Sequence, residues 1–122
     1  MTSTLYQAKA GDGLRKKGMK RADTFFKTPL EAASEALSIK EKIDAKYQNE
    51  IQWDYEAAIT GSREKMKILR GYLAGNRKTN PFYLEILSVE TSKEVSAVTP
   101  LKPKSITNDD QKMLDHVHQL FS

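Results

Sequence analysis

The sequence predicts a mainly α-helical protein organised around a long central helix or helical hairpin over residues 28–75. Three observations point to this fold class. Thr28 and Pro29 form a helix start, Gly75 and Asn76 form a helix stop, and apolar residues recur at helical spacing between them. A C-terminal amphipathic helix over residues 109–121 is predicted to pack on this element. A small β-hairpin over residues 82–99 is the one β element that the pattern allows.

Length and composition narrow the protein class. A chain of 122 residues has the size of one small domain. Uninterrupted apolar runs do not exceed three residues, whereas a membrane-spanning helix needs about 20, and the N-terminus lacks the apolar segment of a signal peptide. The sequence has no cysteine, which excludes disulfides and thiolate chemistry. We therefore expect a cytoplasmic protein that makes no membrane contact.

Charge alternates along the chain in four blocks. Residues 1–27 carry seven Lys or Arg and two acids, residues 28–61 three and seven, residues 62–80 six and one, and residues 81–122 four and six. If residues 62–75 fold back along residues 28–60, much of this charge is neutralised inside the fold. The alternative is that the two basic blocks converge on a surface that attracts phosphate or an acidic protein.

Residues 1–27 are predicted to form a flexible basic N-terminal arm. Gly11, Gly13 and Gly18 interrupt any helical period in this segment. Five cations fall within seven residues of the arm: Arg15, Lys16, Lys17, Lys20 and Arg21. Such a cluster is either a solvated arm or a tail that contacts phosphates, and in the second case its affinity falls with salt.

The helical core is predicted to span residues 28–98. Thr28 can cap the first helix, Pro29 fits the first helical position, and Glu31 completes a capping box. Apolar residues then follow at four-residue steps: Ile43, Tyr47, Ile51, Tyr55 and Ile59. Gly61 either ends a first helix or lies inside a continuous one. The continuous form would be roughly 69 Å long, which implies an oligomer.

Aromatic residues on this element are candidate contacts for a protein partner. Trp53, the only tryptophan, lies off the apolar stripe, so it either packs under a flanking segment or anchors a partner. Tyr47 and Tyr55 belong to the stripe. These three residues are the protein-binding candidates of the central element.

The basic block of residues 62–80 is the better candidate for a nucleic-acid contact. Its candidate phosphate-binding residues are Arg63, Lys67, Arg70, Arg77 and Lys78. Tyr72 lies among them and offers a ring on which a base can stack.

Residues 81–98 fit two descriptions. Asn80 and Pro81 form a helix start, which favours a helix over residues 81–92. Phe82, Leu84 and Ile86 also alternate with neighbouring side chains, which is typical of a strand in a hairpin.

The C-terminal part is predicted to be an extended, proline-containing linker over residues 99–107 and a docking helix over residues 108–122. Asn108 is expected to cap this helix, with Gln111 three residues later. Its apolar face ends in Leu120 and Phe121, which we add to the protein-binding candidates.

Catalytic and metal-binding patterns are not found in the sequence. His116 and His118 are two residues apart, so on a helix they point to different sides and cannot share a metal. We expect neither an enzyme nor a cofactor. The prediction is a non-enzymatic binding protein, an adaptor, inhibitor or subunit of an assembly, that acts through the central helix on a protein partner or on itself. The alternative is an accessory protein that binds single- or double-stranded DNA through the clusters at 15–21 and 63–78.

Overall fold

The protein is a mixed α/β domain, not a mainly helical one. The computed structural model describes residues 3–11, 18–19, 24–56, 59–62, 64–76, 78, 81–91 and 97–121. Two helices occur in these segments, α1 (Pro29–Lys46) and α2 (Asn108–Phe121). The described strands are β1 (Ser3–Gly11), β2 (Gly18–Met19), β3 (Ile51–Asp54), β4 (Thr60–Gly61), β5 (Lys65–Leu73) and β6 (Phe82–Thr91).

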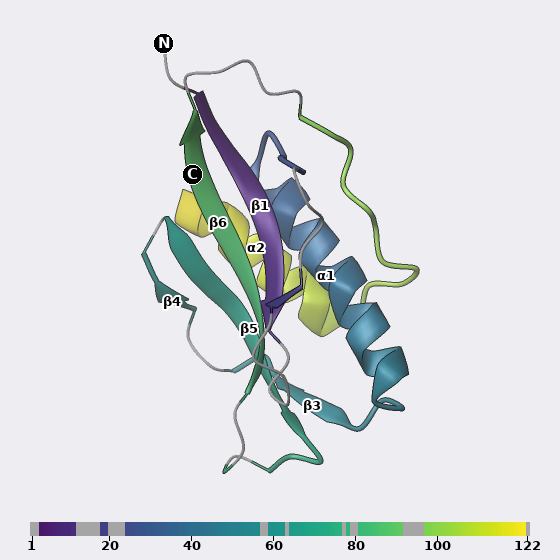
Figure 1. Ribbon diagram of the computed structural model, residues 1–122. Helices are drawn as coiled ribbons and strands as arrows, with labels where there is room; N and C mark the ends of the chain where they lie inside the picture. The colour runs from purple at the N-terminus through teal and green to yellow at the C-terminus, as the bar shows by residue number, and fades with distance from the viewer. Residues whose placement is uncertain are drawn as a thin grey trace.

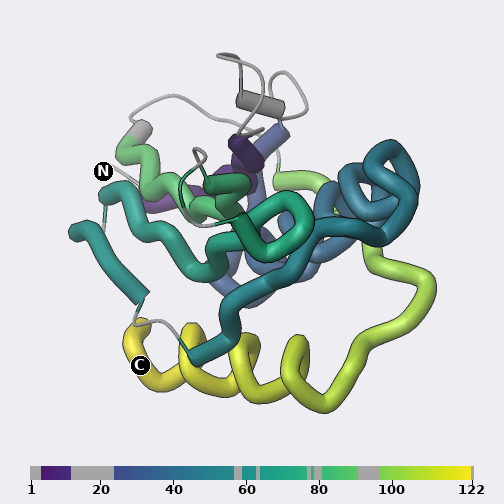
Figure 2. Tube along the Cα trace, turned by 90° about the horizontal axis from the view of Figure 1, so that it is seen from below, coloured from purple at the N-terminus to yellow at the C-terminus, as the bar shows by residue number. Residues whose placement is uncertain are grey.

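All six of these strands belong to one antiparallel sheet. The order is β2-β1-β6-β5-β3, and β4 pairs with the first half of β5. Both α1 and α2 lie behind β1 and β6 as drawn in Figure 1. In Figure 2 the yellow α2 runs along one side of the sheet, and the 97–107 segment loops past α1 to reach it. The two described helices therefore cover one face of the sheet, and no described helix lies on the other.

The predicted central helix is wrong beyond residue 46. The predicted Thr28 cap at its start is confirmed, because Thr28 Oγ1 accepts the Glu31 N–H at 3.1 Å; the Glu31 carboxylate accepts the Thr28 hydroxyl at 3.2 Å. After Lys46 the chain turns through Gln48 and Asn49, whose φ angles of 56° and 59° are left-handed. Ile51 then begins β3, so the four-residue spacing of Ile51 with Tyr55 is not helical.

Gly61 is neither the end of a helix nor a position inside one. It lies in β4 with a φ angle of 105°. Ser62 and Lys65 exchange two backbone hydrogen bonds of 3.2 Å, so this glycine precedes a tight turn between β4 and β5. Gly75, the predicted helix stop, belongs to the turn that follows β5 and has a φ angle of 72°.

The expected helix or hairpin at 82–99 is a single long strand. β6 pairs with β1 from Gly11 to Ser3 and with β5 on its other side. Phe82, Leu84 and Ile86 alternate onto the helix-covered face and are at most 1% exposed. The described residues 97–99 form no strand, so they do not return as the second arm of a hairpin. The predicted mainly helical fold is therefore wrong, and the protein has a central antiparallel sheet with two described helices.

The core lies between the sheet and the two helices. Ala32, Ala33 and Ala36 of α1 are fully buried, and these small side chains let the helix approach the sheet closely. Ala8 and Ala10 of β1 are buried on the facing side. Met113 and Val117 of α2 complete the cluster.

α2 begins at Asn108, the residue that we expected to be its cap, so the cap lies one residue earlier. Thr107 Oγ1 accepts the Asp110 N–H at 3.1 Å, and the Asp110 carboxylate accepts the Thr107 N–H at 3.2 Å. This reciprocal pair is a capping box, so Thr107 takes the capping role that we assigned to Asn108. Within the segments that the structure describes, neither helix is long and apolar enough to cross a membrane.

Candidate nucleic-acid interface

Cations and aromatic rings share the face of the sheet that carries no helix. The pairing register fixes this placement, because residues directly opposite on neighbouring strands project to the same side. Lys9 and Lys67 are both opposite Glu85, Arg70 is opposite Tyr83, and Lys65 is opposite Leu87. Tyr72 follows Arg70 at the two-residue period of β5. We call the set Lys9, Lys65, Lys67, Arg70, Tyr72 and Tyr83 the basic sheet face.

A β-bulge brings two of these cations onto one face. Lys67 and Arg70 are three residues apart, which in a regular strand places their side chains on opposite sides. The register shifts between Lys67 and Leu69, so Ile68 has no partner on β6. Because Ile68 is an extra residue in β5, Lys67 and Arg70 lie on the same side of the sheet, and both project from the helix-free face.

The Tyr83 ring lies over the backbone of the neighbouring strand. A Cβ atom added at Gly11 would overlap the Tyr83 ring, so only glycine leaves room for it there. The Lys67 ammonium lies 4.7 Å from the centre of the same ring. This is cation–π distance, and it shows that the Tyr83 ring attracts cationic groups on this face.

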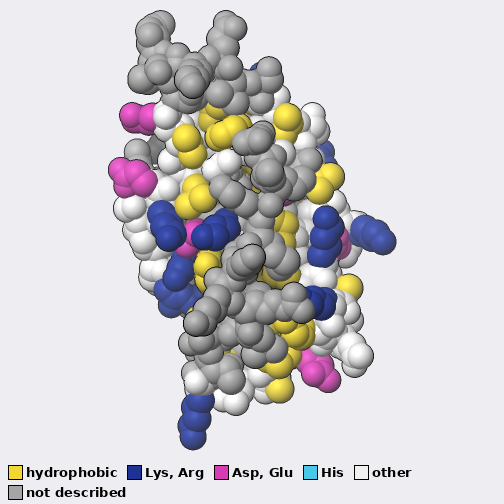
Figure 3. All heavy atoms as spheres, in the orientation of Figure 1, with side chains coloured by type: hydrophobic (Ala, Val, Ile, Leu, Met, Phe, Trp, Pro, Cys, Tyr) yellow, Lys and Arg dark blue, Asp and Glu magenta, His cyan; other side chains and the backbone are white. Residues whose placement is uncertain are grey.

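Cations beside β5 extend the surface. The Arg70 guanidinium donates to Thr60 Oγ1 at 2.7 Å, which holds Arg70 against β4. Lys65 is exposed at the start of β5, and Lys78 is exposed in the connection after it. Figure 3 shows Lys and Arg side chains gathered on this face over the region of β5.

Two carboxylates belong to the same face. Asp54 is directly opposite Arg70 on β3. Glu85 lies between Lys9 and Lys67, is 0% exposed, and has no hydrogen-bond partner for either carboxylate oxygen among the described residues. Four described cations thus share the face with two acids.

Seven predicted phosphate-binding residues fall outside the described residues. They are Arg15, Lys16, Lys17, Lys20, Arg21, Arg63 and Arg77. The structure does place the described candidates Lys67 and Arg70 together. It adds Lys65, which belongs to the same basic block of the sequence. It also adds Lys9 and Tyr83, which sequence reasoning missed, although Lys9 alternates with apolar residues in a way typical of strands.

The aromatic protein-binding candidates of the predicted central element contact the protein's own interior. The Tyr47 ring packs edge-on against Phe82 with centroids 5.2 Å apart. Trp53 Nε1–H donates to Asp44 Oδ1 at 2.8 Å, and the Lys40 ammonium lies 5.4 Å from the Trp53 ring centre.

Tyr55 joins the β3 end of the sheet to α2. Its hydroxyl donates to the Asp110 carboxylate. Burial, followed by this hydrogen bond, raises the pKa of Tyr55 well above the usual value of about 10. Lys40 lies 3.4 Å from Asp44 and 3.9 Å from Asp110, so it links the two carboxylates.

At the C-terminus, the Phe121 ring packs edge-on against Tyr6 at 5.8 Å. Leu120 is 37% exposed. Of the five protein-binding candidates, only Leu120 is an exposed side chain.

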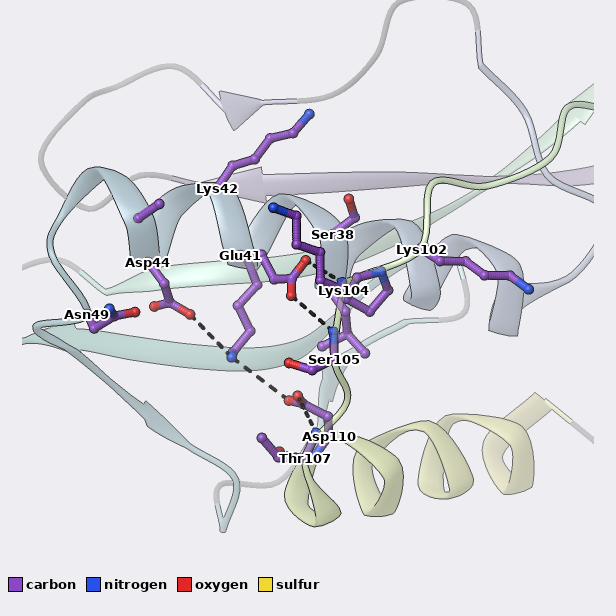
Figure 4. Close-up of a pocket in the computed structure, with 14 residues that line it drawn as sticks. Ser38, Glu41, Lys42, Asp44, Asn49, Lys102, Lys104, Ser105, Thr107 and Asp110 are labelled. Atoms are coloured by element: carbon purple, nitrogen blue, oxygen red, sulfur yellow. Dashed lines mark hydrogen bonds and ion pairs between the residues drawn. The ribbon is translucent and has the colours of Figure 1, made fainter.

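A groove of about 630 Å³ lies between α1 and residues 102–107. Its carboxylates are already bound: Glu41 accepts the Lys104 and Ser105 N–H groups at 2.8 and 3.3 Å. The Lys40 ammonium lies between Asp44 and Asp110. Figure 4 shows Lys42 and Lys102 pointing away from the groove. In this groove the linker is held on α1 by the two hydrogen bonds to Glu41.

Metal-binding geometry is not found in the segments that the structure describes, where no three His, Asp or Glu side chains are grouped to hold an ion. His116 and His118 are both exposed on α2. Comparison with protein-family models, curated proteins and solved structures finds no match.

Proposed function

We propose that this protein binds single-stranded nucleic acid through the basic sheet face, as a binding protein and not an enzyme. One observation carries the proposal: Lys9, Lys65, Lys67 and Arg70 share a helix-free sheet face with Tyr72 and Tyr83. Cations that track the backbone and aromatic rings that stack on bases are the two components of single-strand recognition. An intracellular location belongs to the same proposal.

The lysines of this face support a phosphate-binding role. Lys9, Lys65 and Lys67 form no ion pair within 4.0 Å with a described carboxylate, although Glu85 is directly opposite two of them. Their charges are thus not neutralised by their neighbours in the described part of the chain. A phosphate backbone that crosses β1, β6 and β5 would meet one cation from β1 and three from β5.

Sheet geometry favours a single strand over a duplex. Unpaired bases can lie flat on aromatic side chains of an open sheet, whereas a duplex is usually read by a helix or ribbon that enters a groove. Tyr72 and Tyr83 are both half-buried on this face. Binding through a central helix is not proposed, because α1 ends at Lys46.

A salt-dependent titration tests the proposal. Fluorescence anisotropy with a labelled 16-nucleotide oligothymidine is measured at 50 and 200 mM LiCl. If four cations contact phosphates, affinity should fall on the order of 50-fold between these salt concentrations. A 16-base-pair duplex should bind more weakly. Absence of oligothymidine binding at 50 mM salt would overturn the proposal.

Paired charge reversals locate the surface. Lys67→Glu with Arg70→Glu should lower affinity at least about 10-fold, because two phosphate contacts become repulsive. The matched control is Lys42→Glu with Lys104→Glu, which changes net charge equally at exposed positions on α1 and the linker. Equal losses in the two double variants would show that binding follows net charge alone and not this face.

A further inference from the structure

Strand β3 is an open edge of the sheet (Figure 1). It pairs with β5 on one side, and no described strand pairs with its other side. The Ala74 N–H donates to the Glu50 carbonyl at 2.8 Å, which sets the alternation along the strand. Backbone groups of successive residues point to opposite sides of an antiparallel strand, so those of Ile51 and Trp53 point away from β5. This edge can therefore accept another extended chain.

A cavity of about 290 Å³ lies along the same edge. Gln52 and Tyr72 line it from the helix-free face of the sheet, and Trp53 lines it from the core side. Because residues of both faces line it, the cavity wraps around the edge of β3. No lysine or arginine is among its lining residues, which include three acids: Asp54, Glu56 and Asp109.

The aromatic walls of this cavity are held in place. The indole of Trp53 donates to Asp44 at 2.8 Å, and the Tyr55 hydroxyl donates to the Asp110 carboxylate. Both rings are thus oriented before a ligand arrives, as is usual for a preformed site. The Lys40 ammonium lies 5.4 Å from the centre of the Trp53 ring, so this ring already attracts one cation.

The cavity suits the side chain of an arginine or a lysine. The stem of such a side chain packs on aromatic rings while its charged group contacts carboxylates. Glu56 and Asp109 are exposed, and neither forms an ion pair within 4.0 Å with a described cation. A second copy of β3 would instead bring the same acids to this edge, where like charges repel. Charge complementarity therefore favours a basic partner.

We propose that the open edge of β3 binds a basic, extended segment of a partner protein and takes one of its arginine or lysine side chains into the acidic cavity. The segment adds a strand to the sheet by bonding to the backbone of Ile51 and Trp53, and its cation contacts Glu56 and Asp109. The site does not depend on nucleic-acid binding, although Tyr72 borders both surfaces.

The test is an amide-shift titration of ¹⁵N-labelled protein with the acetylated and amidated pentapeptide Thr-Val-Arg-Val-Thr at low salt. The amides of β3 and the indole N–H of Trp53, the only tryptophan, should shift most. A peptide with citrulline in place of arginine keeps the shape and loses the charge. It should bind at least about 5-fold more weakly, as expected when a cation–π contact and two ion pairs are lost.

Two N-methylated peptides test strand addition. One carries the methyl group on the arginine amide, and the other carries it on both valine amides. Only alternate amides of an added strand bond to β3, so one of the two peptides should lose binding and the other should retain it. Equal binding of the two would overturn strand addition.

Paired neutral substitutions test the acids. Glu56→Gln with Asp109→Asn should weaken the arginine peptide at least about 5-fold and leave the citrulline peptide unchanged. The matched control is Glu90→Gln with Asp115→Asn, which changes net charge equally at exposed positions outside the cavity. Equal losses in the two double variants would overturn the role of the cavity, and thermal unfolding checks that both are folded.

The remaining outcomes also decide the proposal. No shifts in β3 at millimolar peptide, or equal binding of the arginine and citrulline peptides by wild-type protein, would overturn it. Sedimentation of peptide-free protein as a dimer that the peptide does not dissociate would assign the edge to a second copy and overturn it as well. None of these results alters oligothymidine binding, so the two proposals fail separately.

Discussion

The indole Nε1–H of Trp53 donates a 2.8 Å hydrogen bond to Asp44 Oδ1 and thereby ties strand β3 to helix α1. The two residues are nine positions apart, on either side of the left-handed turn at Gln48 and Asn49. Lys40 adds an ion pair to Asp44 and lies against the Trp53 ring. The only tryptophan thus fixes the point where the predicted long helix ends.

Replacing Trp53 tests this tie. Trp53→Phe keeps an aromatic ring but removes the donor, and it should lower the free energy of unfolding by about 1–2 kcal/mol, since a hydrogen bond to a charged group is lost. Urea denaturation followed by circular dichroism measures the change. Gln52→Ala, at the neighbouring exposed position, should lower the free energy of unfolding by less than half as much. Equal decreases in the two variants would contradict the role of the hydrogen bond.

Tyr55 should resist ionisation. Burial and the Asp110 hydrogen bond raise its pKa, so the folded protein holds the hydroxyl proton at pH values where an unfolded chain releases it. The native state then binds more protons than the unfolded state above about pH 10, and stability falls as pH rises through that range. Below that pH this contribution is fully present.

Absorbance at 295 nm between pH 9 and 12 follows the five tyrosines. In native protein one tyrosine should fail to titrate until unfolding begins, and Tyr55→Phe should remove that late step. Simultaneous titration of all tyrosines near pH 10 in folded protein would contradict the assignment.

Glu41 should hold the linker on α1. Its carboxylate accepts the N–H groups of Lys104 and Ser105. In Glu41→Ala these two amides lose their acceptor, and their hydrogen exchange should accelerate roughly 10-fold. Exchange measured by NMR on Glu50→Ala, which changes an exposed acid in the turn before β3, provides the control and should leave both amides unchanged.

Gly11 should be required for the position of Tyr83. Gly11→Ala places a methyl group in the Tyr83 ring and should cost about 1–3 kcal/mol of stability. In a Tyr83→Ala background the same substitution should cost much less, because the ring is gone. Equal costs in the two backgrounds would show that Gly11 and Tyr83 do not interact.

Local signals in the sequence identified helix boundaries well. Thr28 caps α1 by accepting the N–H of Glu31 three residues later, and the amphipathic pattern of Met113 and Val117 marks α2. These signals depend on neighbours in the chain. Asp110 completes the Thr107 cap through similarly local hydrogen bonds. The sequence alone did not distinguish Asp110 from the other acidic residue in the first turn of α2.

The sheet was not predicted because its paired strands lie far apart in the sequence. β1 pairs with β6 across about 80 residues, and neither segment reveals its partner. In the segment between β1 and β6, the four-residue spacing of Ile51 and Tyr55 predicted a helix. In the structure Ile51 and Trp53 lie in β3, and both face the core. Nonlocal pairing overrode the local periodicity.

The candidate site was predictable only in part. Lys67 and Arg70 were found because they lie in a basic block, but their common face results from a bulge at Ile68 that no local pattern marks. Lys9 and Glu85 join them through strand pairing alone. The clusters of basic residues could be identified in the sequence. Only the pairing of distant strands in the sheet brings them onto one face.

The most direct test of the central claim is amide chemical-shift mapping with oligothymidine on the ¹⁵N-labelled protein. The account predicts that shifts concentrate on β1, β5 and β6, with Lys9, Lys67, Arg70 and Tyr83 among the largest. The amides of α1 and the groove beside Glu41 should remain unchanged. Shifts confined to α1 and α2, or none at millimolar oligonucleotide in low salt, would contradict binding at the basic sheet face.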